Sequence, residues 1–202
     1  NCPSLDHGLC TPTGCACRPD WVGRDCATPA TVVLDSADIA PGYYPFAREL
    51  GGGYVLHWKI HPARNNSATS AAGLRELGGD VVEFAMVAPT TGWIGLGINP
   101  SDGGMTQADM YVGTVTSGGQ VRVEDRWSSG YTMPVLDETL GGGSDVLGAA
   151  GKEENGVTII KFVRALEATS AGDKTISRGA NTFAWAYGSS DVFAISCFDF
   201  GK

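Results

Sequence analysis

The stretch from Thr91 to Gly113 constrains the fold of this chain more than any other part of its sequence. It reads TGWIGLGINPSDGGMTQADMYVG, in which an apolar run is interrupted by alternate glycines, a polar glycine-rich loop follows, and a second apolar run begins. Alternation with a period of two is typical of a β-strand. The stretch therefore predicts two consecutive strands joined by a Gly-Gly-Met loop that contains Met105.

Similar alternation recurs along much of the chain. In Tyr54–His61, every second residue from Tyr54 onward falls on a predicted core face, whereas His57, Lys59 and His61 fall on a face predicted to be solvated. Further strands are predicted at 82–88, 108–115, 120–126, 157–164, 182–187 and 192–198. Glycine pairs and triplets separate the segments. Short strands with regular turn signals predict an all-β fold, an antiparallel two-sheet β-sandwich.

Length and charge limit what the protein can be. The 202 residues suffice for one sizeable core and a small appendage, and the 29 glycines suit many strands joined by tight turns. The net charge of −8 argues against nucleic-acid binding, which requires clustered Lys and Arg. The longest apolar runs are too short to span a bilayer, so no membrane insertion is expected.

The central stretch resembles the middle of a DOMON domain, an extracellular β-sandwich whose characterised members bind haem b or sugars in a pocket between the sheets. The resemblance extends from about residue 47 onward, and its pieces occur in the order that the family has. They are VLHWKIH (Val55–His61), EDRWSSGYTMPVLDE (Glu124–Glu138), EENGVTIIKFVRAL (Glu153–Leu166) and NTFAWAYGSSD (Asn181–Asp191). A shared fold does not by itself fix the function.

The resemblance implies a test for haem binding. In the haem-binding branch, a methionine in the Gly-Gly-Met loop supplies one axial iron ligand, and Met105 occupies that position. The second ligand is a histidine shortly after the AYGSSD-like segment, but here the chain continues DVFAISCFDFGK without one. We therefore expect no cofactor and a Met105 that fills a gap at the rim of the sandwich. The alternative is a haem-b electron-transfer domain that uses Met105 and an unexpected second ligand.

Cysteine spacing indicates the compartment. Five cysteines lie near the N-terminus and one near the C-terminus: Cys2, Cys10, Cys15, Cys17, Cys26 and Cys197. The run CACRPDWVGRDC resembles the C-terminal half of an EGF-like module, which we place at residues 1–27. This resemblance implies a Cys17–Cys26 disulfide, with Cys197 either the partner of Cys15 or Cys10 or an intermolecular link. A short disulfide-rich module indicates an extracellular protein, secreted or on the cell surface.

Other residue patterns favour structural roles over chemical ones. His57 and His61 share a strand face but lie about 13 Å apart along it, too far to ligate one ion on a straight strand. Asp102 and Asp109 bracket the Gly-Gly-Met loop and could bind calcium, although turn capping is the preferred interpretation. No Ser/His/Asp set, P-loop or nucleophile elbow occurs, so we do not expect an enzyme. Asn65 begins an N-glycosylation sequon.

Residues 28–46 form a predicted linker to a sandwich at residues 47–202. Within it, Thr31–Leu34 has strand propensity and could pair with a sheet edge of its own or a neighbouring sandwich, or else belong to an exposed spacer. We therefore expect an extracellular structural or adhesive protein that assembles with itself into filaments, or binds other extracellular proteins and glycans. A carbohydrate-binding module is the further alternative, with the predicted rim aromatics Trp93, Tyr111, Trp127 and Tyr131.

Overall fold

The computed structural model describes residues 34, 36–62 and 79–193, and the backbone of four short strands nearer the N-terminus. These strands are β1 (Gly8–Thr11) paired with β2 (Gly14–Cys17), and β3 (Trp21–Val22) paired with β4 (Thr28–Pro29). The cysteine side chains and Asn65 lie outside the described residues. The EGF-like module, its disulfides and the glycosylation site therefore stay predictions.

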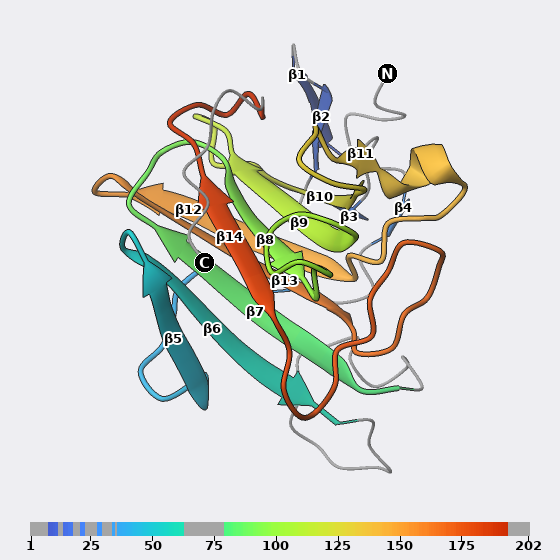
Figure 1. Cartoon of the computed structure of the whole chain (residues 1–202). Coiled ribbons are helices and arrows are strands. Elements are labelled where there is room, and N and C mark those ends of the chain that lie inside the picture. Colours follow the sequence, from blue (N-terminus) through green and yellow to red (C-terminus); the bar gives the residue numbers. More distant parts are fainter. Residues whose placement is uncertain are drawn as a thin grey trace.

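Two five-stranded antiparallel sheets form the body of the protein (Figure 1). The first, called the β8 sheet, has the order β11 (Val135–Leu136), β10 (Val121–Ser128), β9 (Ala108–Val115), β8 (Ile94–Ile98) and β14 (Phe183–Tyr187). The second, called the β7 sheet, has the order β12 (Gly148–Glu154), β13 (Val157–Ala165), β7 (Val81–Ala88), β6 (Tyr54–His61) and β5 (Phe46–Gly51). One 3₁₀ turn, η1 (Asp137–Leu140), follows β11. The predicted all-β, two-sheet antiparallel fold is confirmed.

Strand positions follow the alternation closely. Strands β6 and β9 have the predicted bounds, and β7, β10, β13 and β14 differ from prediction by one or two residues at one or both ends. The strand predicted at 192–198 lies mostly outside the described residues. Strands β5 and β12 are not predicted, because FARELG and GAAGKEE offer few large apolar residues at alternate positions. Strand β12 instead owes its place to a turn at Asn155 and Gly156, whose φ values of 54° and 76° suit a two-residue hairpin to β13.

The core fills the space between the sheets with the inward residues of both. Phe162 on β13 stacks on Tyr111 of β9 with ring centroids 4.6 Å apart, and it also contacts Phe84 of β7. The predicted core faces of β6 and β7 are confirmed, since Leu56 and Phe84 are fully buried in this cluster. Gly113 is required by the packing, because a Cβ there would lie 2.6 Å from the Cδ1 atom of Ile160.

A chain segment from outside the sheets covers the outer face of the β7 sheet. Leu34 packs against Val81 and Val163, and the hydroxyls of Tyr43 and Tyr44 both donate hydrogen bonds to the carboxylate of Glu83. The prediction that this face is solvated is therefore wrong. Alternation identifies which side chains share a face, but it carries no information about a distant segment that lies across that face.

The residues of β6 on this face are held by the covering segment. The ring of His57 lies 5.6 Å from that of Tyr44, Lys59 lies over the ring of Tyr43, and His61 is within 3.0 Å of Glu83. His57 and His61 do not share a cluster of potential metal ligands within the described part of the chain. None of the helices described there is long and apolar enough to cross a membrane.

Candidate ligand pocket on the outer face of the β8 sheet

The loop that carries Met105 is ordered by Asp102. This carboxylate accepts hydrogen bonds from the backbone N–H of Gly104 (2.8 Å) and from the N–H and hydroxyl of Thr106 (3.2 and 2.6 Å). The Thr106 hydroxyl, followed by the Gly104 N–H, lowers the pKa of Asp102 to about 2. The expected turn-capping role of Asp102 is thus what the structure has. Met105 itself is buried, with 3% of its surface exposed.

Met105 lines an apolar pocket on the outer face of the β8 sheet. The pocket is a shallow hollow, and the space of about 410 Å³ between its lining residues includes open solvent. The large residues of β8, such as Leu96, point inward to the core, so only Gly95 and Gly97 face outward from this strand. The small residues Ala184 and Ala186 lie opposite them on β14. Together these four residues form a floor with almost no side chains.

The glycines determine the depth of this floor. A Cβ on Gly97 would lie 3.3 Å from the Met110 Cε atom and 3.4 Å from the Ala184 Cβ, and one on Gly95 would lie 3.5 Å from the Trp93 ring. Glycine in a strand often marks a place where a ligand or another chain approaches the backbone. The walls of the pocket are the apolar side chains of Trp93, Met105, Met110, Val112 and Phe193.

Hydrogen bonds fix the chain segment after β14 at one end of the pocket. The backbone N–H of Trp93 donates to Ser190 O, and the N–H of Gly188 donates to Trp93 O. The Phe193 ring meets the Trp93 ring edge to face, with centroids 4.9 Å apart. Gly92 permits this close approach, because a Cβ there would lie 2.3 Å from Ser190 N. The two rings are therefore held as one wall.

Charged groups lie beside the pocket on β10. The guanidinium of Arg126 lies 5.0 Å from the centroid of the Phe193 ring and donates to Glu124 Oε2 (2.6 Å from Nη2) and to Pro134 O (2.6 Å). Arg122 also pairs with Glu124. The pocket lining contains no acid or base, so it can hold an apolar molecule but offers no group for proton transfer. The nearby arginines suit a ligand with an anionic edge.

The structure corrects several predicted site residues. Tyr111 is fully buried in the core and donates a hydrogen bond to Asp145 (2.6 Å), so it is not a rim aromatic. Met110, on the same strand, faces outward into the pocket. Trp127 lies beneath the Lys174 ammonium group, and Tyr131 is 58% exposed. The four aromatics proposed for sugar binding therefore do not form one surface.

Two further predictions concern the loop and its surroundings. Asp109 does not join Asp102 but points into the protein interior, where it pairs with Arg164. The pocket beside Met105 lies on an outer sheet face, whereas the resemblance implied a pocket between the sheets.

Sequence reasoning missed the floor of this pocket, although IGLGI and FAWAY carry a signal for it. In both strands, small residues occupy every second position.

The sequence profile of the DOMON domain family matches residues 76–188, which is more than half of the chain, and the protein belongs to this family. Two solved structures resemble it at 17% sequence identity. They are the cytochrome b domain of pyranose dehydrogenase from Coprinopsis cinerea, with a TM-score of 0.47, and the cytochrome domain of cellobiose dehydrogenase from Myriococcum thermophilum, with a TM-score of 0.43. Each similarity covers 69% of this chain, and it spans 65% and 63% of the respective cytochrome domains.

Proposed function

We propose that this domain is a non-catalytic binding module whose outer-face pocket holds a flat apolar ligand, and that this ligand is haem b. The observation that carries the proposal is the floor of Gly95, Gly97, Ala184 and Ala186 with the thioether of Met105 beside it. A flat ring system requires a floor free of side chains.

The chemistry of the lining residues fits haem in part. Methionine sulfur is an established haem-iron ligand, and Met105 and Met110 both line the pocket. Arg126 lies at the rim, where a guanidinium would pair with the carboxylates of the macrocycle. No histidine lines the described pocket, so a Met–His ligand pair of the kind that the family uses does not fit. Met105 would hold the iron, and Met110 is the other sulfur ligand within the lining.

The residues around the pocket would contribute burial and orientation. Trp93 and Phe193 exclude water from one end, and the outward glycines allow the ring to approach the backbone. Bound haem would supply one-electron transfer, which none of the side chains that line the pocket can perform. We accordingly propose an electron-transfer or haem-storage module with no catalysis of its own, secreted as its cysteine-rich N-terminal segment suggests.

The other predicted functions have less support. An adhesive or filament role was predicted from Thr31–Leu34. Of these residues only Leu34 is described, and it is packed against the β7 sheet of its own chain. Carbohydrate binding requires polar groups to meet sugar hydroxyls, and the lining of the pocket is apolar.

The proposal is tested by adding haem to purified full-length protein and recording visible absorption. We expect one haem per chain and a sharp Soret band that shifts on reduction. Met105→Leu keeps the volume of the side chain and removes its sulfur, so the Soret band should shift or haem should be lost. Met133→Leu, at a methionine that is 41% exposed, is the matched control and should behave as the unmodified protein does.

A second variant tests the pocket and not the iron ligand. Gly97→Leu fills the floor from an outward position, so haem uptake should fall at least tenfold while the far-UV circular dichroism stays unchanged. Absence of a saturable Soret band in the unmodified protein would refute the haem assignment. Equal spectra for Met105→Leu and the unmodified protein would refute the role of Met105.

A further inference from the structure

Five aspartates gather in the interior of the protein, on the other side of the β8 sheet from the pocket. They come from strands β9 and β10, from η1, from the segment before β12 and from the loop between β13 and β14. Each is at most 9% exposed: Asp109, Asp125, Asp137, Asp145 and Asp173. Arg164 on β13 is the one basic side chain that the described residues place in ion pairs with this cluster.

The charge of the cluster is not balanced by Arg164. Its Nη1 atom donates to Asp109, and its Nε atom lies 3.1 Å from Asp145 Oδ2. Lys174 contributes its backbone N–H to Asp109, but its ammonium group lies over the Trp127 ring. Buried carboxylates in such excess require neutralisation by protons or by a cation.

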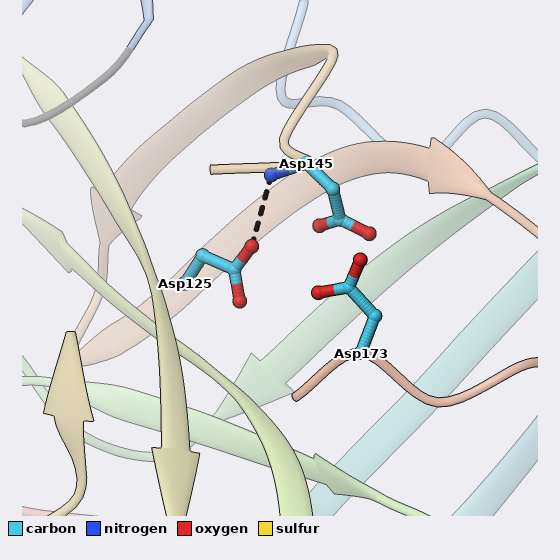
Figure 2. Close-up of side chains that lie close together, drawn as sticks. All are labelled: Asp125, Asp145 and Asp173. Atoms are coloured by element: carbon cyan, nitrogen blue, oxygen red, sulfur yellow. Dashed lines mark hydrogen bonds between the residues drawn. The ribbon is translucent and has the colours of Figure 1, made fainter. Parts of the chain in front are cut away.

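Three of the five aspartates have the geometry of metal ligands. Asp125, Asp145 and Asp173 each offer one carboxylate oxygen, and these oxygens all lie within 4.8 Å of one another. Figure 2 shows that the three carboxylates converge from separate segments of the chain. Two oxygens bound to one Ca²⁺ at about 2.3–2.6 Å can be at most about 5 Å apart, so the observed spacing fits calcium.

Hydrogen bonds orient these carboxylates and keep particular oxygens in place. The N–H of Asp145 donates to Asp125 Oδ2 (2.9 Å; Figure 2). The backbone N–H groups of Thr169 and Ser170 donate to Asp173 Oδ2 (2.8 and 2.6 Å). These donors hold the carboxylates of Asp125 and Asp173 in fixed orientations. The loop between β13 and β14 thus presents Asp173 to the other two residues.

A second observation is independent of the clustering itself. The Oδ1 atoms of Asp125 and Asp137 are buried and have no hydrogen-bond partner among the described residues. Asp137 is 1% exposed and its side chain contacts Asp173, so it is directed toward the same centre. Buried polar atoms in native proteins almost always have a partner. These oxygens therefore offer acceptor sites to a cation at the centre of the cluster.

We propose that Asp125, Asp145 and Asp173 bind a Ca²⁺ ion in the interior of the sandwich, with Asp137 supplying a further oxygen. The donors are all carboxylate oxygens, which hard cations prefer. A site with several buried carboxylates suits calcium better than magnesium, because magnesium usually retains most of its water ligands. The ion would tie β10, η1, the segment before β12 and the β13–β14 loop together, and so join the two sheets at one end.

Calcium titration of the full chain tests this assignment. After removal of metal with EDTA, isothermal calorimetry with CaCl₂ should give one saturable site per chain, and Tm in 1 mM CaCl₂ should exceed Tm in EDTA by several degrees. MgCl₂ should bind at least tenfold more weakly. The absence of a saturable heat and of any Tm shift in the unmodified protein would overturn the proposal, and an equal response to MgCl₂ would overturn the choice of calcium.

Two variants separate a metal site from a cluster that is only protonated. Asp173→Asn keeps the shape and removes one charge, so calcium binding should weaken at least tenfold, while Tm in EDTA should equal or exceed that of the unmodified protein. Asp125→Asn should behave in the same way. The control is Asp191→Asn, at an exposed aspartate outside the cluster, which should keep full calcium binding. Unchanged calcium affinity in both cluster variants would refute the proposed ligands.

Discussion

Replacement of Glu83 by glutamine should destabilise the protein strongly, because Glu83 fastens the covering segment to the β7 sheet. Its carboxylate is 1% exposed and accepts hydrogen bonds from Tyr44 (2.6 Å) and Tyr43 (2.8 Å), with His61 at 3.0 Å. Hydrogen bonds to a charged group contribute about 1.5–3 kcal/mol each. In the glutamine variant, one carboxylate oxygen becomes an NH₂ group that cannot accept these bonds.

The number of hydrogen bonds to Glu83 sets the size of the expected loss of stability. At least one charge-assisted bond is lost outright and the others become neutral, so we expect the free energy of unfolding to fall by about 3 kcal/mol at pH 7. For a chain of this size the Tm should fall by about 6–12 °C. Urea unfolding followed by tryptophan fluorescence measures the difference. Glu49→Gln, at an exposed position on β5, is the control and should cost less than about 0.5 kcal/mol.

The pH dependence gives the sharper test. Burial by itself would raise the pKa of Glu83, but the hydrogen bonds from His61, Tyr44 and Tyr43 outweigh it and lower the pKa below its ordinary value of 4.5. A lowered pKa means that the stabilisation is fully present above pH 4.5 and is lost as the pH falls through the value in the folded protein. The gap between the two proteins should therefore be present at pH 7 and shrink below pH 4.5. No gap at pH 7, or a gap that does not shrink down to pH 3, would refute this reasoning.

Three further substitutions test the packing. Phe162→Ala should lower the free energy of unfolding by about 3–5 kcal/mol in urea titrations, because it empties the centre of the aromatic core. Gly92→Ala places a Cβ against backbone atoms and should cost about 3 kcal/mol. Gly118→Ala, whose Cβ would meet only the Thr116 Oγ1 atom at an ordinary 3.7 Å, should be close to neutral, as Tm measurements can check. Tyr111→Phe removes a buried hydroxyl donor and should cost about 1–3 kcal/mol; an equal effect of exposed Tyr131→Phe would contradict the burial argument.

Much of the candidate pocket could have been anticipated from the sequence. The family resemblance drew attention to Met105, although it implied a pocket between the sheets, and the floor follows from the small residues at alternate positions of IGLGI and FAWAY. What alternation could not supply is the pairing of β8 with β14, which places Ala184 opposite Gly97. That pairing joins segments about ninety residues apart, and a local repeat contains no information about it.

The carboxylate cluster was less accessible to sequence reasoning, although it left a trace. Asp109, Asp125 and Arg164 each occupy an inward position of a strand, in phase with apolar core residues. A charged residue at such an inward position indicates either a buried ion pair or a ligand-binding site. Asp137, Asp145 and Asp173 lie outside the strands, where an aspartate resembles any turn residue. Only the fold brings these loops to the ends of the strands.

Local sequence pattern specifies most of the long strands, their inward faces and the class of fold, because the period of two and the turn residues act over a few neighbouring positions. The tertiary structure decided which faces are covered. It laid Tyr43 and Tyr44 over Glu83, it turned the outward glycines of β8 into the floor of a pocket, and it brought five aspartates around one arginine. These arrangements depend on contacts between residues far apart in the chain, whose free energy no local pattern records.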